Sequence, residues 1–130
     1  EIVFSDPAEL QWLNGVVHPR VRQLITDMAA VARPALFCAI PLLFESGWES
    51  DMSCTVAVWC DPVTQRQRLS RRGWDEREMT RRISQQLSMD EKLRRSDYGI
   101  VSNCSWDLLA EQCQLVYQRV LERSCAQQNA

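Results

Sequence analysis

Glycine and lysine are scarce in this 130-residue chain, and their scarcity excludes the common phosphate-binding loops. The four glycines, Gly15, Gly47, Gly73 and Gly99, lie too far apart to form a glycine-rich loop. The single lysine, Lys92, follows a glutamate rather than a glycine. The chain therefore contains neither a GxxxxGK[ST] P-loop nor a GxGxxG dinucleotide-binding loop.

Metal-binding and membrane-spanning patterns are also missing. One histidine, His18, cannot form a zinc site by itself, and the six cysteines include no CxxC pair, so we expect no metal site. Cys38 and Cys60 lie in apolar runs, where cysteine is typically a small buried hydrophobe, and this favours reduced thiols in a cytoplasmic protein. No segment reaches the ~18 apolar residues of a membrane span. The first residue is not methionine, which suits a chain that begins within a longer protein.

Charge is divided unevenly along a chain whose formal net charge is only -2. Residues 66–95 hold ten basic and five acidic side chains, a net charge of +5, and the remainder has a net charge of -7. A polyanion partner would favour a generally basic chain, so a basic segment in an acidic chain indicates a small anionic ligand. Trp74 is the only aromatic residue of that segment, which argues against nucleic-acid binding.

The first third of the chain predicts two helices and a strand. Asp6-Pro7 is a typical helix start, and we expect a short helix to Asn14-Gly15. A second helix follows His18-Pro19 and ends at Arg33-Pro34. The continuous apolar run 35–40 then predicts a strand that is buried on both faces.

The rest of the chain alternates strands with helices. We expect strands at 55–60 and 98–101, helix starts at Asp61, Asp75 and Ser88, and a final helix from about Ser105. The apolar stripe of that last helix is Leu109, Cys113, Val116 and Val120, and residues 126–130 are expected to be a disordered tail. This order predicts a parallel α/β fold whose ligands bind beyond the carboxyl ends of the strands.

The segment after the predicted strand at 35–40 could carry chemistry. Pro41-Leu42-Leu43-Phe44-Glu45 could line an apolar pocket and offer a carboxylate to a metal-bound water or an acceptor hydroxyl. The alternative is an ordinary strand exit that ends in a solvated glutamate. His18 could contact a ligand or simply fix the junction between two helices.

The arginines of the basic segment suit phosphate oxygens, because the guanidinium group is a planar fork of donors. Arg68 and Arg72 are four residues apart and therefore share a helix face. The alternative is a solvated face that makes exposed ion pairs with Asp75, Glu76 and Glu78, each worth less than ~1 kcal/mol. The spacing leaves both interpretations open.

Five motifs in order resemble the dephospho-coenzyme A kinase family: LNGVVHPRV at 13–21, IPLLFESG at 40–47, QRQRLSRR at 65–72, RISQQ at 82–86 and KLRRSD at 92–97. The resemblance implies an α/β fold of P-loop kinase type, with a parallel sheet, helices on both faces, a helical substrate-binding part and a lid. It also implies the last step of coenzyme A synthesis: with Mg²⁺, the γ-phosphate of ATP passes to the ribose 3′-hydroxyl of dephospho-CoA.

The resemblance also assigns segments and residues. Residues 1–34 would be the helical substrate-binding part, 35–65 and 97–125 the kinase core, and 66–96 the basic lid. The dephospho-CoA contacts would be His18, Pro41, Leu42, Leu43 and Glu45. The ATP contacts would be Arg68, Arg72, Arg82 and Gln86 at the phosphates and Asn103 beside the adenine.

The family's P-loop, with its lysine, its magnesium-holding hydroxyl and the strand before it, has no counterpart in this chain. The chain is therefore expected to be the C-terminal portion of a kinase, with no catalytic residue, no metal ligand and no activity of its own. In the family sheet, the missing strand lies between the strands that correspond to 35–40 and 55–60, so both would lose a shared neighbour. Two other functions stay open: a non-catalytic module that binds coenzyme A or a nucleotide, and another P-loop small-molecule kinase. The sequence predicts no oligomeric state.

Overall fold

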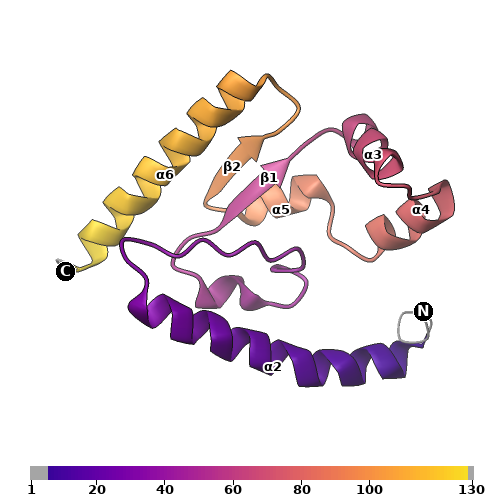
Figure 1. Cartoon of the computed structure of the whole chain (residues 1–130), viewed down its shortest axis with the longest axis horizontal. Helices are drawn as coiled ribbons and strands as arrows, with labels where there is room; N and C mark the ends of the chain where they lie inside the picture. Colours follow the sequence, from indigo (N-terminus) through magenta and orange to yellow (C-terminus); the bar gives the residue numbers. More distant parts are fainter. Residues whose placement is uncertain (1–5, 129–130) are drawn as a thin grey trace. The chain divides into compact units, whose positions relative to one another are not determined.

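A computed structural model describes residues 6–128 of the chain (Figure 1). The chain divides into two compact units, one up to Ala39 and the other from Ile40 onwards. None of the described helices combines the length and the apolar character that a membrane crossing requires.

The first unit consists mainly of one long helix, α2 (Pro7–Val31). Asp6 caps it as predicted, because its Oδ1 accepts a hydrogen bond from Ala8 N at 2.9 Å. The predicted division into two helices is wrong, since Pro19 lies inside the continuous helix. Proline removes one backbone donor, and the many other hydrogen bonds of a 25-residue helix outweigh that loss here.

The predicted strand at 35–40 is also wrong. These residues adopt no regular secondary structure, and Phe37, Cys38 and Ala39 are exposed rather than buried. A strand needs a neighbour to pair with its backbone groups, and no described strand pairs with this segment. Cys60 is buried as expected, whereas Cys38 is exposed.

The second unit is built on a two-stranded parallel sheet of β1 (Val56–Trp59) and β2 (Tyr98–Val101). Val56 lies opposite Tyr98, and Trp59 lies opposite Val101. Both strands were predicted. Because they are parallel, their carboxyl ends lie at the same edge, where the chain continues to α3 and α6 (Figure 1).

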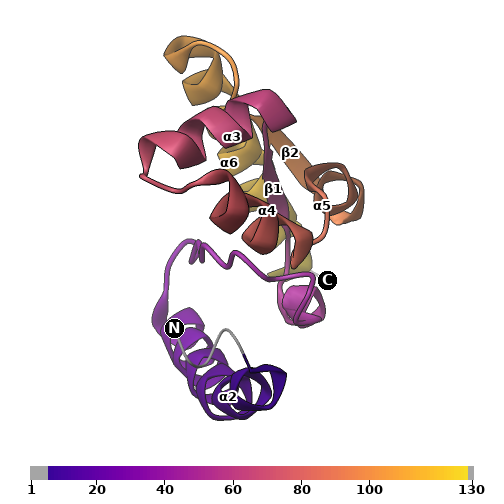
Figure 2. The ribbon, with the colours of Figure 1, turned by 90° about the vertical axis from the view of Figure 1, so that its right-hand side faces the viewer.

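The helices of this unit follow the predicted caps. They are the 3-10 helix η1 (Trp48–Asp51) and the α-helices α3 (Pro62–Arg71), α4 (Glu76–Ser84), α5 (Met89–Arg95) and α6 (Trp106–Gln128). Asp61, Asp75 and Ser88 cap α3, α4 and α5 through backbone N–H groups at 2.8 to 3.1 Å. Helix α5 packs against β1, and α6 packs against β2. Figure 2 shows α6 passing behind the two strands.

The core of the unit lies between β2 and α6, where Ile100, Val116 and Val120 are buried together with Leu109 at their margin. The predicted apolar stripe of the last helix is therefore correct except at Cys113, which is exposed. The helix instead turns Gln112 toward β2, where its amide donates to Val101 O at 3.1 Å and accepts from Val101 N at 2.9 Å.

The predicted disordered tail at 126–130 is wrong for its first three residues, because α6 continues to Gln128. Alanine and glutamine are good helix formers, so the helix propagates through them. Residues 129 and 130 lie outside the described residues.

Candidate nucleotide and acceptor site

The segment after Ile40 folds into a tight turn over residues 41–47, called the acceptor turn below. Ser46 N donates to Leu42 O at 3.0 Å, and Trp48 N donates to Leu43 O at 3.0 Å. Gly47 ends the turn with φ +68°, a left-handed conformation that favours glycine. Phe44 and Trp48 are buried and anchor the turn, whereas Pro41 and Leu42 are exposed.

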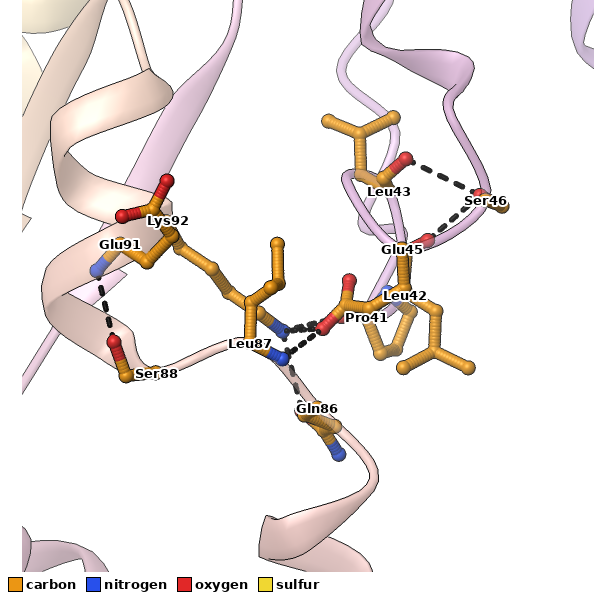
Figure 3. A network of polar contacts seen from close by, with 10 residues as sticks. All are labelled: Pro41, Leu42, Leu43, Glu45, Ser46, Gln86, Leu87, Ser88, Glu91 and Lys92. Carbon is orange, nitrogen blue, oxygen red and sulfur yellow. Dashed lines mark hydrogen bonds and ion pairs between the residues drawn. The ribbon is translucent and has the colours of Figure 1, made fainter.

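Glu45 is the carboxylate of this turn, and two donors hold one of its oxygens. Its Oε1 accepts from the Lys92 ammonium and from Leu87 N, both at 2.9 Å (Figure 3). Lys92 Nζ also donates to Pro41 O at 3.0 Å and to Gln86 Oε1 at 3.2 Å. The structure thus brings together three predicted site residues, Pro41, Glu45 and Gln86, around a lysine that the prediction did not include.

The environment of Glu45 favours its ionised form. Burial raises the pKa of its carboxyl group, but the hydrogen bond from Lys92, backbone N–H donors and the charge of Lys92 together lower it below the ordinary value. The donors prevail over burial because they bind the charged form directly. Glu45 can therefore accept a hydrogen bond from a ligand at neutral pH.

A second group of polar side chains lies at the carboxyl ends of the two strands. Asn103, after β2, donates from Nδ2 to Asp61 Oδ2 at 2.9 Å, and Asp61 follows β1. Arg68, on α3, donates to Ser102 Oγ at 2.8 Å and to Ser102 O at 2.6 Å. Two predicted nucleotide contacts, Arg68 and Asn103, therefore lie at the edge where parallel sheets bind ligands.

The Asp61 carboxylate stays ionised at this edge. Hydrogen bonds from the side chain and the backbone N–H of Thr64 lower the pKa of Asp61, and the amide of Asn103 contributes further. Asp61 thereby joins α3 to the loop after β2. It presents a negative charge, so it suits ribose hydroxyls or an adenine amino group better than a phosphate.

The arginines of α3 and α4 are divided between ion pairs and solvent. Arg82 Nε donates to Glu78 at 2.5 Å, and its guanidinium group lies 4.5 Å from the centre of the Trp74 ring. The same Glu78 accepts from Arg81 at 2.7 Å, and these contacts, that of Arg82 first, lower the pKa of Glu78. Arg72 is exposed and forms no ion pair within residues 6–128.

The remaining predicted residues are Leu42 and Leu43 on the acceptor turn and His18 in the first unit. Leu43 is half-buried and Leu42 is exposed on the acceptor turn. His18 is half-buried in α2 of the first unit. Sequence reasoning missed Lys92, Leu87 and Ser102; the signal available for Lys92 was that it is the only lysine in the chain.

Within the described part of the chain, no three His, Cys, Asp or Glu side chains converge as metal ligands. An ion that arrives bound to nucleotide phosphates needs few protein ligands.

Comparison with known proteins gives consistent results. A family model described as dephospho-CoA kinase matches residues 1–107. The dephospho-CoA kinase of Symbiobacterium thermophilum is 37% identical over 122 residues, which cover 90% of this chain and 51% of that protein. The dephospho-CoA kinase of Listeria monocytogenes serotype 4b is 35% identical over 117 residues, which cover 86% of this chain and 58% of that protein. The chain thus spans about half the length of these relatives.

A solved structure gives the same result for the fold. The crystal structure of TT1252 from Thermus thermophilus matches with a TM-score of 0.75 and 34% sequence identity. The match covers 91% of this chain and 63% of that one. This likeness, with the parallel sheet, confirms the predicted α/β, P-loop kinase-like fold.

Proposed function

Because this chain belongs to the dephospho-CoA kinase family, we propose that it serves the ATP-dependent phosphorylation of the ribose 3′-hydroxyl of dephospho-CoA. That reaction is the last step of coenzyme A synthesis. The family match over residues 1–107 is the observation that carries the proposal, since it includes every residue considered at both groups of polar side chains.

The acceptor turn is proposed to contact dephospho-CoA. Pro41, Leu42 and Leu43 offer apolar surface, and the ionised Glu45 offers an acceptor for a hydroxyl or amide donor of the substrate. His18, in the first unit, is proposed separately as a dephospho-CoA contact on the family resemblance alone.

Residues 66–96, which include most of α3 and all of α4 and α5, are proposed to form a lid over ATP. Phosphoryl transfer depends mainly on positioning and on neutralising phosphate charge, which arginine forks do well. Arg68, Arg72, Arg82 and Gln86 are the proposed phosphate contacts, and Asn103 is the proposed adenine contact. Arg68 and Arg82 would exchange their present partners, Ser102 and Glu78, for phosphate oxygens when the lid closes.

Turnover requires a phosphate cradle, and the 130 residues contain no GxxxxGK[ST] sequence. We therefore expect the polypeptide alone to be inactive with ATP, Mg²⁺ and dephospho-CoA. The measurement is the formation of coenzyme A over time, with an intact relative such as the Symbiobacterium enzyme as the positive control. Turnover comparable to that control would contradict this part of the proposal. A cytoplasmic location agrees with six free thiols.

Calorimetry distinguishes this proposal from the alternative, a non-catalytic binding module. Such a module binds dephospho-CoA without ATP and melts cooperatively, whereas part of a kinase site binds either ligand weakly. A different P-loop kinase would prefer another acceptor, which a panel of nucleosides and small alcohols would identify.

A further inference from the structure

Lys92 is the only lysine of the chain, and three oxygen acceptors surround its ammonium group. They are Glu45 Oε1 at 2.9 Å, Pro41 O at 3.0 Å and Gln86 Oε1 at 3.2 Å (Figure 3). An ammonium group has three donors, so these contacts match its full donor capacity. The side chain is only 13% exposed, whereas a lysine that serves solubility keeps its charge in water. The position of the Lys92 ammonium group is therefore fixed by these three protein oxygens.

These acceptors come from two segments that are distant in sequence. Pro41 and Glu45 belong to the acceptor turn, and Gln86 belongs to the link between α4 and α5. The same link supplies Leu87 N, the second donor to Glu45 Oε1. Lys92 thus joins the acceptor turn to the C-terminal part of the proposed lid, residues 66–96.

A second residue of α5 holds the same region. Arg95, three residues after Lys92, places its guanidinium group 4.9 Å from the centre of the Phe44 ring and forms an ion pair with Glu49. Residues three apart lie on one face of a helix. One face of α5 therefore holds the acceptor turn through two cations.

The other oxygen of Glu45 has a different environment. Oε2 is buried and has no hydrogen-bond partner among residues 6–128. A buried carboxylate oxygen is much more stable with a donor than without one. With Oε1 held by two donors, Oε2 is the oxygen of Glu45 that still lacks a donor, so a ligand donor that displaces the atoms covering it would pair with a charged acceptor.

We infer that Lys92 is a positioning residue of the acceptor site: it holds Pro41 and the Glu45 carboxylate in the geometry that accepts a hydroxyl or amide donor of dephospho-CoA. The inference rests on the proposed function. Lys92 acts through Glu45, because all three donor positions of its ammonium group are already matched by protein oxygens.

The test is Lys92→Met in the 130-residue chain, with binding followed by amide NMR shifts during titration with dephospho-CoA. In the unmodified chain, the amides of residues 41–47 and of Leu87 shift. Lys92→Met weakens that binding about tenfold, because a charge-assisted contact is lost. It leaves the shifts that ATP causes near Arg68 and Asn103 unchanged.

Arg94→Met is the matched control. It removes one positive charge from the same helix, but Arg94 is 73% exposed and pairs only with Glu91 within its own helix among the described residues. Its affinity for dephospho-CoA should equal that of the unmodified chain. Equal weakening by both variants would show a general effect of charge and would overturn the inference.

A double variant tests whether Lys92 acts through Glu45. Glu45→Gln alone weakens dephospho-CoA binding, and adding Lys92→Met then costs little more; additive effects would overturn the inference. If Lys92→Met unfolds the chain, the test relies on Glu45→Gln alone. An affinity of Glu45→Gln for dephospho-CoA equal to that of the unmodified chain would then overturn the inference. Absence of dephospho-CoA shifts in the unmodified chain also overturns it, whereas phosphorylation assays test the proposed function separately.

Discussion

At the scale of single residues, the strongest charge effect is at Asp97, outside the candidate site. Its Oδ2 accepts from Thr55 N and Thr55 Oγ1, both at 2.8 Å, and its Oδ1 accepts from Arg123 at 2.5 Å. The contact with Arg123, and then those with Thr55, lower the pKa of Asp97 from 3.8 to about 2. The carboxylate thereby joins α6 to both strands at their amino ends.

Asp97→Asn should lower the free energy of unfolding at pH 7 by about 1 kcal/mol, because the partners remain and the charge is lost. The folded state has the lower pKa, so this stabilisation is present above the unfolded pKa and is lost as pH falls from about 4 toward 2. Urea unfolding of both proteins over pH 7 to 2 measures it. A difference that stays constant over that range would contradict the assignment.

Arg68 and Arg72 should behave differently, although the sequence treats them alike. Arg68 donates twice to Ser102, whereas Arg72 is exposed. Arg68→Met should lower the free energy of unfolding by about 1 kcal/mol, and Arg72→Met should change it by less than about 0.5 kcal/mol. Thermal unfolding without ligand makes the comparison, and equal shifts would show that the Ser102 contacts contribute nothing.

The residue scale also shows what the sequence could and could not predict of the site. The PLLFE motif singled out Glu45 and the arginine spacing singled out Arg68 as candidates, although the strand expected before Glu45 is absent from the described sheet. Their partners were not predictable, because Lys92 meets Glu45 across 47 positions and Ser102 meets Arg68 across 34. No local pattern encodes contacts of that separation.

At the scale of elements, α5 lies so close to β2 that Gly99 has no room for a side chain. A Cβ atom at Gly99 would lie 2.3 Å from Leu93 Cδ1. Gly99→Val should therefore lower the free energy of unfolding by about 1–3 kcal/mol, as overpacking does. Urea unfolding measures the loss.

Two companion variants isolate the cause of that loss. Leu93→Ala combined with Gly99→Val should be less destabilising than the two single changes added together, because the smaller side chain makes room. Gly15→Ala is the control, since its Cβ would meet no atom within 4 Å and alanine favours a helix. If the losses in free energy of unfolding from Leu93→Ala and Gly99→Val simply add in the double variant, the proposed clash between Leu93 and the new side chain is excluded.

Elements with local signals were predictable, and elements that depend on a distant neighbour were not. Aspartate or serine caps marked the starts of α3, α4 and α5, and short apolar runs marked β1 and β2. The run at 35–40 has the composition of a buried strand, yet it pairs with no described strand. Helix α2 continues through Pro19 because the many other hydrogen bonds of this 25-residue helix outweigh the one donor that proline lacks.

At the scale of the whole molecule, the charge division and the fold support the same account. The basic residues 66–95 include the last turn of α3 and all of α4 and α5, while the acidic Asp61 lies just beyond the carboxyl end of β1. A cationic segment beside a sheet edge suits a small ligand with several phosphates, as ATP and dephospho-CoA both are.

The most direct measurement of the central claim uses a chimera in which this chain replaces the matching 122-residue segment of the Symbiobacterium thermophilum relative. The account predicts a folded enzyme that converts dephospho-CoA to coenzyme A with ATP and Mg²⁺ and that loses most of this activity with Arg68→Met. A folded chimera that leaves dephospho-CoA unmodified, or that prefers another acceptor, would contradict the account.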